Sequence, residues 1–171
     1  MFELKYCMKS SKGFTLVELL VVIGVLGILA LGLLATIDPL EQFKKGADAN
    51  TRQSAIELVN ALNRYYAVNS AYPWGIQSPC IGGSPNGAIL NTMSICVTYL
   101  INAGELKSTF SEQTKIMASL SVTSPLGEGV TVCFNPDSKA ESLAPPTKYD
   151  SLGGAKTSCP IAGGSCYWCA R

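Results

Sequence analysis

The sequence predicts an α+β protein in which a long N-terminal helix packs on a small antiparallel β-sheet head. Three observations carry this prediction. An apolar run follows a basic N-terminus, and apolar residues then recur every three or four positions along a second helical stretch. Short strand-like segments separated by glycine- and proline-rich turns make up the rest. The length of 171 residues suits one modest domain plus an extra element.

The first half of the helix is an apolar run over residues 14–37, which carries one charged side chain, Glu18. At ~1.5 Å per residue this run would measure ~36 Å as a transmembrane helix, enough to cross a hydrocarbon core of ~30 Å. The lysine-rich stretch before it predicts a cytoplasmic N-terminus. Three glycines in the run form no GxxxG pair, and we interpret them as general packing aids: Gly24, Gly27 and Gly32.

A candidate processing site lies before the apolar run, whereas a secretory signal peptide would be cut after it. The sequence KGFTLVELLVVI at residues 12–23 resembles the class III signal of type IV pilins and of type II secretion pseudopilins. The resemblance is close over residues 9–37 and continues loosely to the Tyr72-Pro73 pair. The remainder of the chain carries no motif of comparable specificity.

The resemblance implies that a prepilin peptidase cuts between Gly13 and Phe14, removes a leader of residues 1–13 and methylates the new amine of Phe14. It also matches Glu18 to the acidic residue at the fifth mature position of the family. A carboxylate inside a membrane segment needs a partner. The new amine lies four residues before Glu18, on the same helix face, and a neighbouring subunit's amine would fix the stagger between packed helices. The alternative is that Glu18 reaches the lipid headgroups.

The second half of the helix is expected over residues 38–68 and is amphipathic. Asp38 can cap and Pro39 can take the first helical position, so the helix restarts or kinks at this pair. Residues 69–88 are rich in Gly, Pro, Ser and Asn and predict a long loop. Residues 89–103 then predict a short helix, with a strand as the alternative because of Val97, Thr98 and Ile101.

The head is expected to occupy residues 69–171 and to be stapled by disulfides. Residues 119–123 and 130–134 predict two strands of a hairpin. Residues 139–144 are interpreted as an edge strand and residues 165–170 as a final strand. Together these segments predict a small antiparallel sheet covered by the long helix.

Seven cysteines are many for this length, and cleavage would remove one of them, Cys7, with the leader. The other six follow the membrane segment, where disulfides persist: Cys80, Cys96, Cys133, Cys159, Cys166 and Cys169. Sequence leaves the pairing open; we select Cys80 with Cys96, Cys133 with Cys169, and Cys159 with Cys166. The alternatives are a zinc site made of Cys133, Cys159, Cys166 and Cys169, and a redox C-x-x-C at the last two.

No enzyme chemistry is expected. The chain has no histidine and none of the common phosphate-loop, nucleophile-elbow or zinc-protease motifs, so we assign no catalytic, cofactor or metal site. A net charge of +1 gives no reason to expect a nucleic-acid partner. Four aromatic residues form either a contact patch or, as is more common, half-buried packing: Tyr72, Trp74, Tyr167 and Trp168.

The function expected from the resemblance is that of a structural subunit of a type IV pilus-like filament. The alternatives are a pseudopilin of a type II secretion system, or a minor pilin for adhesion or DNA uptake. The expected partners are prepilin peptidase, other copies of the chain, minor pilins, the pilus or secretion machinery and the membrane. The precursor would be a single-pass membrane protein, and the mature chain would join an extracellular or periplasmic filament.

Overall fold

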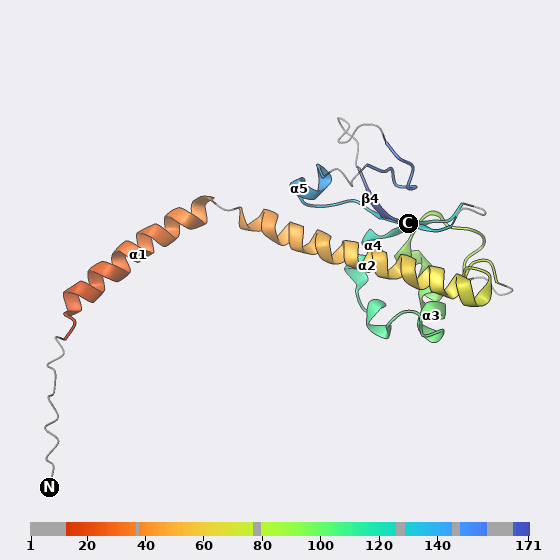
Figure 1. Cartoon of the computed structure of the whole chain (residues 1–171), viewed down its shortest axis with the longest axis horizontal. Helices are drawn as coiled ribbons and strands as arrows, with labels where there is room; N and C mark the ends of the chain where they lie inside the picture. The colour runs from red at the N-terminus through yellow and green to blue at the C-terminus, as the bar shows by residue number, and fades with distance from the viewer. Residues whose placement is uncertain (1–12, 37, 77–79, 126–128, 145–147, 157–165) are drawn as a thin grey trace, which may run out of the picture. The chain divides into compact units, whose positions relative to one another are not determined.

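The computed structural model describes residues 13–36, 38–76, 80–125, 129–144, 148–156 and 166–171. The chain forms two compact units that divide between Pro39 and Leu40. The first unit contains helix α1 (Leu16–Thr36), and the second contains nearly all of helix α2 (Pro39–Asn69) together with the head (Figure 1).

Apart from Glu18 and the last residue, Thr36, helix α1 consists of Leu, Val, Ile, Ala and Gly residues, with no proline among them. Every large apolar side chain from Phe14 to Leu33 is exposed. The helix ends at Thr36 and α2 begins at Pro39, so the predicted long helix is interrupted just before the proline. Proline is favoured at the first position of a helix because it lacks the backbone N–H that must donate a hydrogen bond in the helix interior.

Helix α2 buries one stripe of its surface, as its apolar spacing predicts. The buried apolar positions recur along the second half of the helix at Ala55, Leu58, Val59, Ala61, Leu62 and Tyr65. The helix ends where Ser70 takes a left-handed conformation, with φ of 54°, and donates its N–H to the carbonyl of Tyr66 at 2.7 Å. This is the αL cap that commonly ends a helix.

Four short strands make one antiparallel sheet, in the order β1-β2-β3-β4. They are β1 (Asn86–Ile89), β2 (Ser121–Thr123), β3 (Thr131–Phe134) and β4 (Trp168–Ala170). The predicted hairpin is confirmed, because Val122 of β2 lies opposite Val132 of β3. Strand β1 overlaps the end of the stretch predicted as a loop, so that prediction was wrong at residues 86–88, and the last residue of β1, Ile89, falls in the stretch predicted as a helix.

Short helices complete the head: η1 (Leu90–Met93), α3 (Ser94–Asn102), η2 (Ser108–Phe110), α4 (Thr114–Ser119) and α5 (Lys139–Ser142). The helix predicted over residues 89–103 is confirmed as η1 followed by α3. The edge strand predicted over residues 139–144 is wrong, because α5 occupies this stretch. Ser138 caps α5 by accepting the N–H of Glu141 at 3.2 Å, which favours a helical turn over an extended strand.

A single core joins α2 to the sheet and to α3. It contains Leu58 and Leu62 from α2, Val97 and Leu100 from α3, and Val122, Val132 and Phe134 from the strands. The predicted α+β fold is therefore confirmed: a long helix covers a small antiparallel sheet, and their apolar faces are buried together (Figure 1).

Candidate functional site

The predicted processing site lies in an open stretch before α1. Gly13 is exposed, and Phe14 is 75% exposed. A Cβ atom built on Gly13 would meet no atom within 4 Å. The described residues therefore set no steric demand for glycine at position 13.

Glu18, four residues after Phe14, takes part in a capping box at the start of α1. The Glu18 carboxylate accepts the N–H of Thr15 at 3.0 Å and its hydroxyl at 2.8 Å, and the Thr15 hydroxyl accepts the N–H of Glu18 at 3.2 Å. The pattern Thr-x-x-Glu is a recognised capping signal, and we did not predict this role from the sequence. It holds the carboxylate at the N-terminus of α1, on the backbone N–H and hydroxyl of Thr15, the residue after Phe14.

Helix α1 has the length and composition of a membrane span. The stretch Leu16–Leu33 has a mean hydropathy of 2.8 and is not buried. Among the described residues it is the one helix that is long and apolar enough to cross a membrane. This is consistent with a single-pass membrane precursor.

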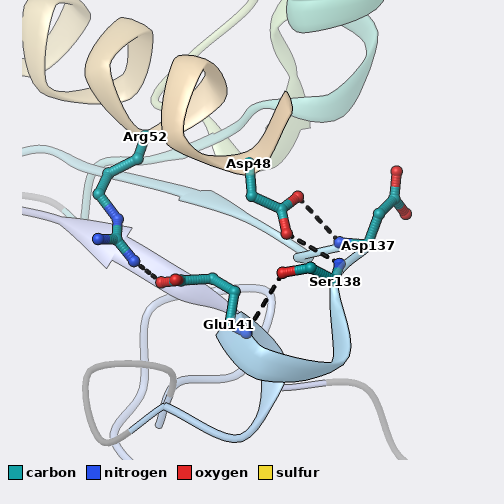
Figure 2. A network of polar contacts seen from close by, with 5 residues as sticks. All are labelled: Asp48, Arg52, Asp137, Ser138 and Glu141. Atoms are coloured by element: carbon teal, nitrogen blue, oxygen red, sulfur yellow. Dashed lines mark hydrogen bonds and ion pairs between the residues drawn. The ribbon is translucent and has the colours of Figure 1, made fainter. Parts of the chain in front are cut away.

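In the head, a polar clasp fastens the segment after β3 to α2. Figure 2 shows the carboxylate of Asp48, from α2, pointing at the backbone of Asp137 and Ser138. It accepts the N–H of Asp137 at 3.0 Å and that of Ser138 at 2.8 Å. Asp48 is 5% exposed, so these bonds replace the water that a buried carboxylate has lost. The side-chain carboxylate of Asp137 points away from the clasp (Figure 2).

A second pair of contacts lies one turn further along α2. Arg52 forms an ion pair with Glu141 of α5 (Figure 2). Its guanidinium also lies over the ring of Trp168 in β4, 5.1 Å from the ring centroid. Trp168 packs in turn against Phe134 of β3, with ring centroids 5.6 Å apart. Arg52 thus links α2 to both α5 and β4. The sequence analysis assigned no role to Arg52.

Two disulfides cross-link the head within the described residues. A disulfide joins Cys80 to Cys96, with Cα atoms 5.0 Å apart. A second disulfide joins Cys133 of β3 to Cys169 of β4, which lie directly opposite each other in the sheet. These are two of the pairs that we selected from the sequence.

Cys166 is disulfide-bonded as well, and its predicted partner, Cys159, lies outside the described residues. Cys7, in the leader, also lies outside them. Because Cys133, Cys166 and Cys169 are all disulfide-bonded, they supply no thiolates for the alternative zinc site or for a redox C-x-x-C. Across the described part of the chain, no group of three or more His, Cys, Asp or Glu residues is arranged to hold a metal ion.

The four aromatic residues singled out in the sequence fall into two clusters. Tyr72 and Trp74 stack beyond the end of α2, with ring centroids 5.0 Å apart. Tyr167 pairs with Tyr149 in an isolated β-bridge, and Trp168 lies under Arg52. The single contact patch considered from the sequence is therefore not formed by these four residues together.

Comparison with known proteins adds one match. The profile of the prokaryotic N-terminal methylation motif matches residues 8–34, which include the candidate cleavage site, Glu18 and most of α1. No curated protein and no solved structure matches the chain. The motif at residues 8–34, an apolar N-terminal helix and an α+β head together support a class III prepilin-like protein, of the family of type IV pilins and pseudopilins.

Proposed function

We propose that this chain is a structural subunit of a type IV pilus-like filament. The observation that carries the proposal is the methylation motif on an apolar helix whose large side chains are all exposed from Phe14 to Leu33. Such a surface must be covered by lipid before assembly and by other subunits afterwards. The proposed role is structural, and we assign no enzymatic activity.

Processing would follow from the exposed position of the Gly13–Phe14 bond. Prepilin peptidase would cut this bond, release the leader of residues 1–13 and methylate the amine of Phe14. Since the described residues set no steric demand for glycine at position 13, a requirement for it would come from the peptidase.

Glu18 would then act in assembly. In the uncleaved chain its carboxylate is held by Thr15, at the end of α1 where the new amine would arise. The amine of a neighbouring copy is the partner that would fix the stagger between packed helices. Because the cap already orients the carboxylate, it would present a fixed acceptor to that amine. Further copies and minor pilins would add to the filament through pilus machinery.

A type II secretion pseudopilin is the second candidate, and a specific observation favours it. The helical stretch from Ala55 to Tyr66, followed by Asn69-Ser70-Ala71-Tyr72-Pro73, resembles a segment of the major pseudopilins. We favour the pilus because the disulfide-bonded head suits a subunit exposed outside the cell. An adhesion or DNA-uptake minor pilin ranks third. The subunit would begin with a cytoplasmic N-terminus and end in an extracellular or periplasmic filament.

Substitution at the cleavage site tests the proposal. Gly13→Val should leave the precursor uncut and abolish filaments, as seen by immunoblot mobility and by electron microscopy of sheared cell surfaces. Gly24→Val is the matched control, since a Cβ there also meets no atom within 4 Å; it should be processed normally. Normal processing of Gly13→Val would contradict the proposal. Loss of protein secretion without any filament in a deletion strain would favour the pseudopilin.

A further inference from the structure

The first turns of α2 differ from the rest of that helix, because their large apolar side chains are exposed. Leu40 is 70% exposed and Phe43 is 76% exposed, whereas Leu58 and Leu62 further along α2 are 1% and 2% exposed. Leu40 and Phe43 are three positions apart, so they lie on the same side of the helix. Together they form a small apolar face that gains free energy when a partner removes it from water.

Two lysines follow this apolar face directly in the sequence. Lys44 and Lys45 are both exposed. Two acids of the same turns are engaged by the head instead: Asp48 is buried in the clasp, and Glu41 accepts a backbone N–H from α5 at 3.2 Å. The exposed charges that follow Phe43 on α2 are therefore both positive.

The chain keeps this face close to a membrane when α1 spans one. Helix α1 has 21 residues, so at ~1.5 Å per residue it measures ~32 Å, close to the thickness of a hydrocarbon core. Its last residue, Thr36, would then lie near the boundary between the core and the headgroups. Leu40 follows four positions later, at most about 14 Å of chain away. The apolar face is therefore within reach of the headgroup layer, with one exposed acid, Asp38, in the connection.

We propose that Leu40, Phe43, Lys44 and Lys45 dock on the phospholipid surface while the chain is unassembled. The two apolar side chains would enter the boundary between headgroups and acyl chains, where the apolar faces of interfacial helices lie. The two lysines would extend to lipid phosphates, as long cationic side chains do at membrane surfaces. This contact would hold the head beside the membrane until assembly takes the subunit out of the lipid.

This docking rests on the insertion of α1 into a membrane, which is part of the proposed function, and it is independent of the kind of filament that the chain joins. A second copy of the chain is the other partner that could cover the same face. Lipid is favoured because the short connection from α1 keeps the face beside the headgroups, and because lipid phosphates suit the two lysines. A photo-crosslink distinguishes the two partners by the mass of the adduct.

The test uses the full chain in vesicles of phosphatidylcholine and phosphatidylglycerol. The photo-reactive analogue p-benzoylphenylalanine, which inserts into nearby C–H bonds, replaces Phe43, Val68 or Leu26, one at a time. Val68 is the matched control, because it is also 76% exposed but lies at the far end of α2. Leu26, in the middle of α1, reports insertion. By mass spectrometry after irradiation, we expect lipid adducts at positions 26 and 43, and at least about fivefold fewer at position 68.

Charge variants test the lysines. Lys44→Gln with Lys45→Gln should lower the lipid adduct at position 43 by at least about threefold in these vesicles. Lys107→Gln with Lys148→Gln removes the same charge from two exposed lysines of the head and should leave the adduct unchanged.

Three results would each overturn the proposal while the adduct at position 26 is present. They are equal lipid adducts at positions 43 and 68, equal effects of the two pairs of lysine substitutions, and adducts from position 43 to a second copy of the chain in place of lipid. Absence of the lipid adduct at position 26 would overturn the insertion of α1, and with it both this proposal and the proposed function.

Discussion

Helices α1 and α2 are both long, yet their side chains have opposite surroundings. In α1, every large apolar side chain through Leu33 is exposed, and the sequence has no polar face. In α2, the apolar residues between Ala55 and Tyr65 form one stripe that is buried in the core with the sheet and α3, whereas Leu40 and Phe43 near its start are exposed. The same secondary structure therefore serves two purposes, and the periodicity of the apolar residues separates them.

This difference shows what stabilises each helix. The α2 stripe is covered within the head, which also has two described disulfides and the Asp48 clasp. The surface of α1 needs lipid or other copies of the chain. Substitutions in α1 should therefore change assembly and leave the unfolding of the head unchanged, whereas substitutions in the clasp and staples should change unfolding.

The largest effect is expected at Glu18. Glu18→Ala should lower the yield of sheared filaments by at least about tenfold, because the neighbour's amine loses its partner. The urea midpoint of the head should stay the same. Thr15→Val is the control, since it removes the hydroxyl that caps α1 but keeps the acid; it should lower the yield no more than about twofold. Normal assembly of Glu18→Ala would refute the charge-pairing account, and equal losses in both variants would reduce Glu18 to a helix cap.

The disulfides should have the next largest effect, this time on the head alone. The Cys133–Cys169 bridge spans 36 residues and the Cys80–Cys96 bridge spans 16. Loop-closure entropy then predicts losses of about 4 and about 3 kcal/mol in the free energy of unfolding when each pair is changed to alanine. Urea denaturation measures both. An unchanged midpoint in both double variants would mean that the bridges do not constrain the unfolded chain.

A smaller loss is expected from the clasp. Asp48→Ala would leave the N–H groups of Asp137 and Ser138 without their acceptor, at a cost of about 3 kcal/mol in unfolding free energy. Asp137→Ala is a matched control, because its exposed carboxylate points away from the clasp and should matter by less than about 0.5 kcal/mol (Figure 2). Equal effects of the two variants in urea unfolding would show that the clasp contributes nothing specific.

The smallest effect is expected at Arg52. Arg52→Met keeps the apolar stem but loses the ion pair and the contact with the Trp168 ring, at a cost of about 1 kcal/mol. Arg64→Met is the comparison, since Arg64 pairs with Glu105 at 2.7 Å but its side chain is 54% exposed, against 33% for Arg52. Arg64→Met should lower the free energy of unfolding by less than Arg52→Met does. A greater loss for Arg64→Met would mean that the aromatic contact adds nothing.

The sequence predicted those helices and strands whose apolar residues recur at a regular spacing. The apolar run and the amphipathic stripe indicated α1 and α2, and the alternating segments indicated β2 and β3. The predicted helices and strands depend on residues close together in the chain or on one simple rule of alternation. The sequence left the cysteine pairing open, and two of the pairs that we selected are present.

The features that we did not predict from the sequence depend on contacts between distant residues or on short capping signals. Strand β1 pairs with β2 through residues more than thirty positions away, and no local pattern marks it. The clasp joins Asp48 to Ser138 across 90 positions. Helix α5 and the cap of α1, in contrast, could have been predicted: Ser138-x-x-Glu141 and Thr15-x-x-Glu18 both have the Ser/Thr-x-x-Glu pattern of a capping box.

The mass of the intact chain isolated from its native membranes or filaments, measured without reductant, tests the central claim most directly. The account predicts a chain that begins at Phe14, carries one methyl group and is about six hydrogens lighter than its reduced form, because three bridges remain closed. A mass that retains residues 1–13, or a chain beginning at an unmethylated Phe14, would contradict it.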